Sequence, residues 1–456
     1  MREILTALDG LAPDLSLRAM DAVHGHDDRW NGALDVRSLA AASVGLAAAS
    51  AREFTRASGR PSVEITATLP EIVAAFASVS QLRIDGQPLL GFAPCSGFFR
   101  TADGWLRTHA NYPHHRARLF RALGIDHDNA LAPALAHLTS RDAESHIVSE
   151  GGVAACVVSE GEWRQEAAHD PGPWLHLCPG DSNIADRHRS PRPDSHPWRP
   201  VHPHAGSVPL PLHGVRVVSL TRVIAGPTAA KFLAALGADV IRIDPPAMPE
   251  LLGQHLDTDQ GVRCTARDLS DPIAAGDLAG LLGQADVLLT GYRPGSLAAL
   301  GLDGARVRER FPHLVHVELS AWEPTGPRAG QRGFDSIVQA ATGIAHRYGS
   351  TDSTGLWRPG ALPVQALDHV TGYGMAAAAC GLLAAGRSGS ARLSLERTAR
   401  VLLDGGGSEC SHPSPNTGPR SETVEMTTEH GRVTCVPAPV RVNGRRPPVL
   451  PPLPTG

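Results

Sequence analysis

The feature that most constrains the fold is a regular alternation of apolar strands and helices over residues 212–400. It begins with HGVRVVSLTRVIAGPTAAKFLAALGADVIRIDPP, which predicts a strand, a turn, a helix and a second strand. Near-continuous apolar strands joined by helices are typical of a parallel sheet covered on both faces. We therefore expect an α/β protein with a Rossmann-like, doubly wound, mostly parallel sheet and a smaller α+β domain.

The flanking segments have other patterns. SLAAASVGLAAASAREFTRASG has helical spacing and a Gly stop, and FFRTADGWLRTHA predicts a β-hairpin that turns at Asp103-Gly104. DSNIADRHRSPRPDSHPWRPVHPHAGSVPLP is rich in Pro, Arg and His without periodicity, which is typical of a linker. We predict a helical segment at 1–60, a small α+β domain at 61–180, a Pro/His-rich linker at 181–211, a Rossmann-like domain at 212–404 and a Gly/Pro-rich segment at 405–456.

Composition narrows the function classes. The formal net charge is −4 over 456 residues, so nothing favours nucleic acid or an anionic membrane as a partner. No run of about 18 apolar residues occurs, and the opening residues MREILTALDGLAPD lack the plan of a signal peptide. The seven cysteines are scattered without CxxC spacing. We expect a cytoplasmic protein with neither a disulfide framework nor a metal site.

Four histidines in the predicted linker raise the question of a metal site. They are His188, His196, His202 and His204. Pro-rich sequence of this kind is not expected to hold ligands in a fixed geometry, so we interpret these residues as a solvated linker.

The turn after the first strand is the expected ligand site, because ligands of a doubly wound sheet bind beyond the carboxyl ends of its strands. Residues 221–227 occupy that place, and Gly226 relieves crowding at the helix start. The glycine fingerprint of a dinucleotide site is absent, although Asp244 ends the next strand as a ribose-binding acid would. An NAD site is therefore disfavoured, and an ordinary βα turn remains an alternative.

Four segments, in order, resemble the family III CoA-transferases, the CaiB–BaiF family that includes formyl-CoA transferase and α-methylacyl-CoA racemase. The first is the opening strand–turn–helix–strand. The others are ADVLLTGYRPGSLAALGL at 285–302, LVHVELSAWEPTGPRAGQRGFDSIVQAATG at 314–343 and VQALDHVTGYGMAAAACGLLAA at 364–385. The resemblance implies that the domain at 212–404 binds CoA and carries catalysis.

Two pairs of segments within the chain also resemble each other, which we call the internal echo. GRPSVEITATLPEIVAAF resembles GSARLSLERTARVLLD, and FFRTADGWLRTHA resembles TTEHGRVTCVPAP, in the same order. Residues 59–175 resemble a family C-terminal half with its small domain, and residues 389–456 resemble the same half without it. We hypothesise that a truncated copy precedes the main copy and supplies the small domain over its active site.

Asp368 is the candidate catalytic residue. It follows LPVQAL, which predicts a strand, and it opens a helix of small residues, TGYGMAAAACGLLAA. A carboxylate at a helix start faces N–H groups that favour its ionised form, and an ionised carboxylate can be a nucleophile. Asp at this position is also a common helix cap, and both uses can hold at once. The D-x-x-T-G match to the family, Asp368 to Gly372, implies the nucleophile.

The family mechanism, carried to this position, has Asp368 attack a donor acyl-CoA to give an acyl–aspartyl anhydride and CoA thiolate. The thiolate then forms an aspartyl–CoA thioester, and the acceptor carboxylate captures this and leaves as the new acyl-CoA. The implied function is an acyl-CoA:carboxylate CoA-transferase, with CoA thioesters as substrates and no permanently bound cofactor. GGG at 405–407 is a candidate for the family's glycine loop, with a simple connector as the alternative.

The resemblance also implies CoA contacts. Backbone atoms of Ile224 and Ala225 would touch CoA, and Tyr292 would flank the adenine. Arg222 and Arg293 are candidate phosphate contacts, since a guanidinium can donate two bonds to phosphate. Two departures weaken the expected affinity for CoA. Gly291 stands where many members carry Asn, and AMPELLGQHLDTDQGVRCTARDL is short and lacks the usual basic residues.

Two other functions stay open. Racemases of the family carry a His in a G-H-D motif where this chain has Phe334, which cannot exchange a proton, so a 2-methylacyl-CoA racemase is disfavoured. His369 is another candidate proton carrier, although an exposed or cap-adjacent His is the simpler interpretation. The second alternative is a non-catalytic, transferase-like CoA-binding protein. The partners implied are an acyl-CoA, a carboxylic acid and a second copy in a homodimer.

Overall fold

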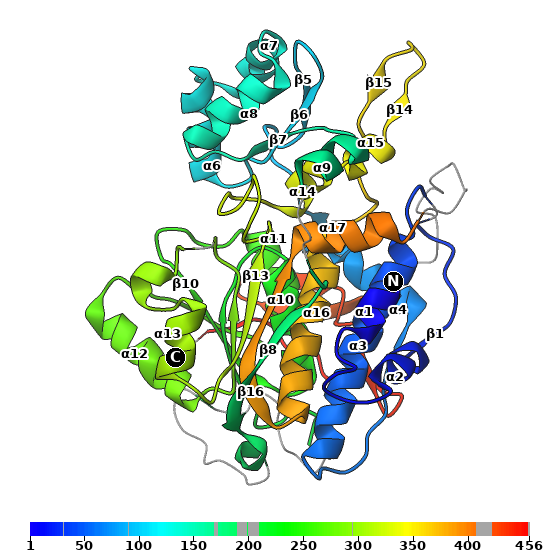
Figure 1. Cartoon of the computed structure of the whole chain (residues 1–456), viewed down its shortest axis with the longest axis vertical. Helices are drawn as coiled ribbons and strands as arrows, with labels where there is room; N and C mark the ends of the chain where they lie inside the picture. The colour runs from blue at the N-terminus through cyan, green and yellow to red at the C-terminus, as the bar shows by residue number, and fades with distance from the viewer. Residues whose placement is uncertain are drawn as a thin grey trace.

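A large mixed sheet forms the centre of the molecule (Figure 1). The computed structural model describes residues 1–30, 32–89, 91–167, 172–188, 198, 209–293, 295–406 and 422–454. The eight strands run in the order β20-β11-β10-β9-β12-β13-β16-β8 and are parallel except for β8 on β16. The expected α/β fold with a mostly parallel sheet is therefore confirmed.

The strands of this sheet have the following bounds: β8 (His176–Asn183), β9 (Arg216–Leu220), β10 (Asp239–Asp244), β11 (Arg263–Ala266), β12 (Val287–Thr290), β13 (Val315–Ser320), β16 (Arg387–Ser394) and β20 (Leu453–Pro454). After β9, the strands β10 and β11 are added in turn on one side of β9. The next strand, β12, then pairs with β9 on its other side. That reversal leaves a crevice beyond the carboxyl ends of β9 and β12, where ligands of such sheets bind.

Helices cover both faces of the sheet, which explains why its central strands β9, β10 and β12 are buried over nearly their whole length. Val217 belongs to the larger core cluster, while its neighbour Val218 belongs to a second cluster on the other face. The larger core contains α3 (Val36–Ala57), α10 (Ala225–Ala235) and α16 (Ala366–Ala384), and α16 packs between the other two. The second cluster is built from α12 (Pro272–Gln284) and α13 (Gly304–Arg310).

A smaller body lies above the carboxyl ends of the strands (Figure 1). Its antiparallel sheet is β5 (Phe98–Arg100), β6 (Trp105–Thr108) and β7 (Ala154–Cys156), and Thr101 N–H donates to the Gly104 carbonyl (3.0 Å) at the predicted hairpin turn. Its helices are α6 (Pro113–Leu123), α7 (Leu131–Ala136), α8 (Ser140–Ser149) and α9 (Glu160–Glu166). Near it lie α14 (Asp335–Ala341), α15 (Ile344–Arg347), β14 (Ser350–Thr351) and β15 (Trp357–Arg358).

The two ends of the chain fold against each other. β2 (Ile65–Thr68) pairs with β1 (Val23–His24) on one side and with β19 (Arg441–Val442) on the other. β18 (Gly431–Cys435) pairs with β17 (Val424–Thr428) and with β3 (Arg83–Ile84), which also pairs with β4 (Gln87–Pro88). The remaining helices are α1 (Arg2–Thr6), α2 (Leu15–Asp21), α4 (Leu69–Phe76), α5 (Ser78–Gln81), α11 (Leu252–Thr258) and α17 (Leu395–Asp404).

Two sequence expectations need correction. The linker was predicted to begin at 181, but β8 continues to Asn183 because its backbone pairs with β16, and Trp198 is buried in the second core cluster. LPVQAL was predicted as a strand, but α16 begins at Ala366 and no strand precedes it in the described part of that segment. His196, His202, His204 and Gly407 lie outside the described residues. None of the described helices is long and apolar enough to cross a membrane.

Candidate active site

Asp368 lies where two cavities meet, in the first turn of α16. One cavity has a volume of about 360 Å³ and the other about 440 Å³, and both are lined by Tyr112, Val223, Phe334 and Asp368. The Asp368 side chain is buried, with 6% of the residue exposed. A single carboxyl group thus faces two chambers with different walls.

The start of α16 is capped by a different carboxylate, Asp335 of α14. One Asp335 oxygen accepts the Asp368 N–H at 3.0 Å, and the carboxylate also accepts the Leu367 N–H. The Gln339 amide donates to its other oxygen. The N–H groups that we expected to favour an ionised Asp368 therefore stabilise Asp335 instead, so that part of the expectation was wrong.

Burial and mutual repulsion raise the pKa of both carboxyl groups. For Asp368, burial raises the pKa well above its ordinary value, and the nearby Asp335 charge raises it further. For Asp335, burial raises the pKa to about 6, while the hydrogen bonds from Gln339 and the helix N–H groups oppose the rise. Asp335 has donors for its negative charge, whereas no described group donates to the Asp368 carboxyl. Asp368 is therefore the partner that holds a proton more tightly.

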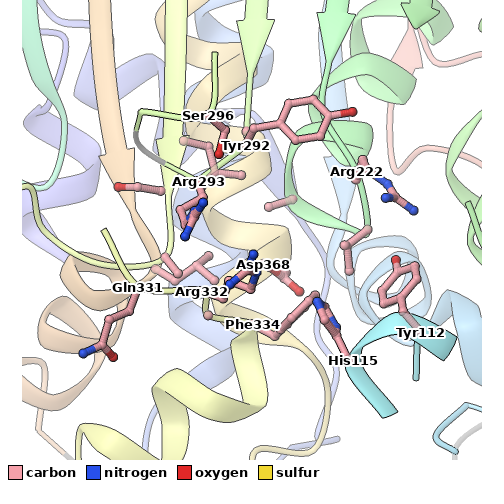
Figure 2. Close-up of a pocket in the computed structure, with 18 of the residues that line it drawn as sticks. Tyr112, His115, Arg222, Tyr292, Arg293, Ser296, Gln331, Arg332, Phe334 and Asp368 are labelled. Atoms are coloured by element: carbon pink, nitrogen blue, oxygen red, sulfur yellow. The ribbon is translucent and has the colours of Figure 1, made fainter. Parts of the chain in front are cut away.

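Arginines gather in the smaller cavity (Figure 2). Its lining includes Arg118, Arg222, Arg293 and Arg332, and the only acid among its described lining residues is Asp368. Burial lowers the pKa of Arg332, and the charges of Arg293 and Arg118 lower it further, so these cations lie within electrostatic range of one another. Like charges held together in this way fit a ligand with several negative charges, such as a diphosphate.

The turn after β9 is held in an unusual conformation. Val223 has a φ of 71°, in the left-handed region that a β-branched residue rarely adopts. Its N–H donates to Glu250 (2.9 Å), and the Tyr112 hydroxyl donates to the other Glu250 oxygen (2.6 Å). A Cβ on Gly226 would lie 2.3 Å from Thr221 Cβ, so the close turn requires glycine. Glu250 thus fixes both the turn and the residue that approaches it from the smaller body.

The larger cavity has a mixed wall of apolar and polar side chains, with no Arg or Lys among its described lining residues. Phe76, Val79, Leu89 and Phe92 line it from the N-terminal part of the chain, and Ile224 and Val364 line it from the large domain. His109 stacks on Phe334 with ring centroids 3.7 Å apart and nearly parallel planes (5°). Residues before and after position 212 therefore build this chamber together.

The sequence-predicted residues divide between the two chambers. Arg222, Ala225, Tyr292 and Arg293 line the cavity of the arginines, and Ile224 lines the other cavity. His369 was expected to be exposed or next to a cap, but it is buried against Phe76, with ring centroids 4.8 Å apart. Burial lowers its pKa to about 3, so the ring is neutral at ordinary pH.

Sequence reasoning missed several lining residues. Tyr112, His115 and Arg118 come from the segment NYPHHRARL, and Arg332 precedes the Gly-Phe-Asp motif. The density of aromatic and basic side chains directly after a predicted hairpin was the available signal. Their distance along the chain from Asp368 concealed the contact.

One group of side chains has a metal-like composition. His255, Asp259 and Cys264 bring one ligand atom each within 4.8 Å of one another. Both oxygens of Asp259, however, accept from Arg242 Nη1 at 2.9 Å, so a buried guanidinium already neutralises the carboxylate. This arrangement does not fit a metal ion.

The parallel sheet, the crevice beside β9 and the carboxyl group in a cavity with four arginines define an α/β protein with a candidate anion site at its strand ends. Comparison with known sequences gives a family for one region: residues 212–393 match CoA-transferase family III.

Curated relatives match over the same region. A probable fatty acyl-CoA transferase of Mycobacterium tuberculosis is 31% identical over 37% of this chain and 45% of its own length. A succinate–glutarate CoA-transferase of Agrobacterium fabrum is 33% identical (39% and 48%), and a succinyl-CoA:glutarate CoA-transferase of Homo sapiens is 31% identical (38% and 42%). A crystal structure of the Mycobacterium tuberculosis protein aligns with a TM-score of 0.40 at 29% identity, covering 43% of this chain and 57% of that one. The chain spans a little under half the length of these curated relatives.

Proposed function

We propose that this protein is an acyl-CoA:carboxylate CoA-transferase in which Asp368 carries the transferred groups. The observation that supports this most directly is the position of Asp368 between a chamber lined by four arginines and a chamber whose described lining contains no Arg or Lys. An acyl-CoA has the same division, with a polyanionic nucleotide at one end and an acyl group at the other. Its thioester carbon lies between the two, where Asp368 stands.

The reaction proceeds through two kinds of intermediate. An Asp368 oxygen bonds to the thioester carbon, the C–S bond breaks, and CoA leaves as a thiolate, giving an acyl–aspartyl anhydride. The thiolate then bonds to Asp368 Cγ and releases the donor carboxylate. The acceptor carboxylate attacks this aspartyl–CoA thioester to form a second anhydride, and the thiolate takes the acceptor acyl group. Asp368 ends as a free carboxylate, so no group is consumed.

Several contacts support the assignment of CoA to the smaller chamber. Arg293, Arg118 and Arg332 would meet the phosphates, because guanidinium groups bind anions and Asp368 is the only acid among the described wall residues. Arg222 would join them, although its guanidinium also pairs with Glu250 at 3.6 Å. The Ala225 backbone would approach CoA at the turn after β9, and Tyr292 would flank the adenine. The Ile224 backbone would approach CoA from the side of the larger chamber, which Ile224 lines. CoA is a substrate in this proposal, with no permanently bound cofactor.

We also propose that the N-terminal part takes the place of the family's small domain. Tyr112, His115 and Arg118 line the same cavity as Asp368, which supports a contribution of this part to the active site. The other boundaries of the predicted division, at 60, 211 and 404, stay a proposal with it. A homodimer and a cytoplasmic location are further expectations, which light scattering and fractionation would test.

A racemase remains the second candidate because an imidazole lies against Phe334. His109 stacks on this ring in the same chamber as Asp368. Burial lowers the pKa of His109 to about 3, so the ring is uncharged at neutral pH and cannot act as a cationic acid. Racemisation would exchange the α-hydrogen of a 2-methylacyl-CoA with deuterated water, whereas CoA transfer would not.

Trapping the covalent intermediate tests the proposal. Wild-type protein incubated with an acyl-CoA and hydroxylamine should give a hydroxamate at position 368, detected by mass spectrometry of the peptide. Asp368→Asn should give none and should lose transfer activity by ~10³-fold or more. Asp277→Asn, at an exposed position of α12, is the matched control and should behave as wild type. Unmodified wild-type peptide would instead support a non-catalytic CoA-binding protein.

A further inference from the structure

The two chambers beside Asp368 differ in charge. The smaller is lined by four arginines, whereas none of the described residues that line the larger is Arg or Lys. The larger chamber's acids are Asp335 and Asp368 themselves. Its two histidines, His109 and His369, have pKa values that burial lowers to about 3, so they add no positive charge at neutral pH.

A buried cation close to this chamber is not part of its wall. Arg107 on β6 has its guanidinium carbon 5.0 Å from the centroid of the Phe92 ring and 4.9 Å from that of Phe98. Phe92 lines the chamber, but Arg107 does not. At this point of the wall a ligand would therefore touch the Phe92 ring, while the Arg107 charge acts on the Asp335 carboxyl of the same chamber and lowers its pKa.

Five neutral polar side chains of Ser, Asn and Gln lie among the apolar residues of the described wall, namely Ser80, Asn111, Gln254, Ser336 and Gln365. Gln254 Oε1 and Ser336 Oγ are buried without a hydrogen-bond partner among the described residues, and both residues line the larger chamber. Small-molecule sites combine apolar walls with a few such groups, which fix the orientation of the ligand. Neutral donors and acceptors suit a hydroxyl, carbonyl or amide group.

We propose that the larger chamber takes the acyl body of the substrate and that the protein selects acids with an uncharged, mainly apolar body over dicarboxylic acids. This inference rests on the proposed CoA-transferase function. A second carboxylate in the chamber would lose water without meeting a cation there, and it would lie close to Asp335 and Asp368. The selected substrates would therefore differ from the succinate and glutarate for which two of the relatives are named.

Calorimetric binding to the full-length Asp368→Asn variant tests this assignment without turnover. The ligands are CoA, hexanoyl-CoA and succinyl-CoA. Hexanoyl-CoA should bind about 10-fold or more tightly than CoA, because its methylene groups leave water for contact with the chamber's apolar side chains. Succinyl-CoA should bind no more tightly than CoA. Asp368→Asn removes one negative charge from the chamber. Succinyl-CoA therefore meets less repulsion in this variant than it would in the wild-type protein.

Filling the chamber should remove the gain from the acyl group. Ser80→Trp and Val79→Trp, each added to Asp368→Asn, should reduce the affinity for hexanoyl-CoA to that for CoA and leave the affinity for CoA unchanged. Ser149→Trp is the matched control. Ser80 and Ser149 are both exposed, and each hydroxyl donates to the carbonyl three residues earlier, but Ser149 lies on α8 away from both chambers.

The outcomes separate this inference from the proposed function. If succinyl-CoA binds as tightly as hexanoyl-CoA, or if neither tryptophan variant reduces the binding of hexanoyl-CoA, the acyl assignment is overturned and the CoA assignment stands. If CoA and both thioesters fail to bind, the proposed function is overturned, and the acyl assignment fails with it.

Discussion

Two aspartates, Asp335 and Asp368, have different roles at the start of α16. Asp335 takes the helix N–H groups and the Gln339 amide, and it thereby fixes the position of the helix that carries Asp368. Asp368 stays without a described donor and faces both chambers. We infer that Asp335 is a positioning residue and that its charge also raises the proton affinity of Asp368, the proposed nucleophile.

Asp335→Asn should shift the acidic limb of the pH profile of kcat to lower pH. The Asp335 charge is one cause of the raised pKa of Asp368, so removing that charge lowers this pKa and leaves more Asp368 ionised at a given pH. The Asn oxygen can still accept the N–H groups of α16. A purely structural role would instead lower kcat at every pH and leave the limb in place.

Asp368→Asn should make the folded protein more stable near pH 7.5, by about 0.5–2 kcal/mol. A carboxyl whose pKa is raised by folding binds a proton more tightly in the folded state than in the unfolded chain. Stability is therefore lost as the pH rises from the ordinary Asp pKa through the raised one. For Asp335 this pH window is about 4 to 6, and for Asp368 the window also begins at the ordinary Asp pKa. Denaturant unfolding at pH 7.5 and pH 4 measures the effect, and the gain should shrink at pH 4. A destabilised variant at pH 7.5 would contradict it.

At the scale of elements, the local sequence pattern correctly predicted strands of the parallel sheet, but it wrongly predicted a strand at LPVQAL. β9, β10, β12 and β13 each lie where the pattern predicted a strand. Leu362, Val364 and Ala366 alternate as a strand would, but the Leu362 N–H donates to the Gln339 side chain (2.9 Å). Asp335 then starts the helix. Side chains of α14 replace a neighbouring strand, and the local sequence carries no signal of that.

Gly372→Ala should destabilise the protein by about 1–3 kcal/mol and reduce transfer activity. A Cβ at this position of α16 would lie 2.3 Å from the Ala225 carbonyl oxygen of α10, so the two helices must separate. Asp368 is one turn earlier on the same helix and would move with it. The measurement is denaturant unfolding together with a CoA-transfer assay.

Gly276→Ala is the matched control, because this glycine also lies within a helix, α12, and a Cβ there meets nothing within 4 Å. It should stabilise the protein by about 0.5–1 kcal/mol. Equal losses in both variants would show that close packing of α16 on α10 is not the cause.

At the scale of the whole molecule, the chain order hides which parts fold together. Arg222, Tyr292 and Arg293 could be predicted because each follows a recognisable strand and lies at the crevice. Arg118 reaches the same cavity only because the smaller body lies over the strand ends. The echo between the two ends of the sequence suggested this placement. The packing of α3 on α16 had no counterpart in the sequence pattern, since an Ala-rich helix can pack on many surfaces.

Residues 1–200 and 201–456, produced as separate polypeptides, should each lack a cooperative thermal transition and should regain one when mixed. The first would lose the sheet that β8 joins, and the second would expose the face of α16 that α3 covers. β2 and β3 would also lose the partners β19 and β18. Size-exclusion chromatography and circular dichroism melts check this. Cooperative melting of 201–456 alone at the temperature of the intact chain would contradict it.

The two outer strands of the large sheet come from segments remote in sequence from the strands beside them. β8 closes one edge against β16 with antiparallel pairing, and the short β20, which ends in Pro454, closes the other against β11. A sheet edge with unpaired backbone groups is a template for further strands, and a proline or a brief terminal strand blocks such growth. Removing residues 176–183 or 450–454 should therefore expose unpaired backbone groups of β16 or β11, and the protein should self-associate through them.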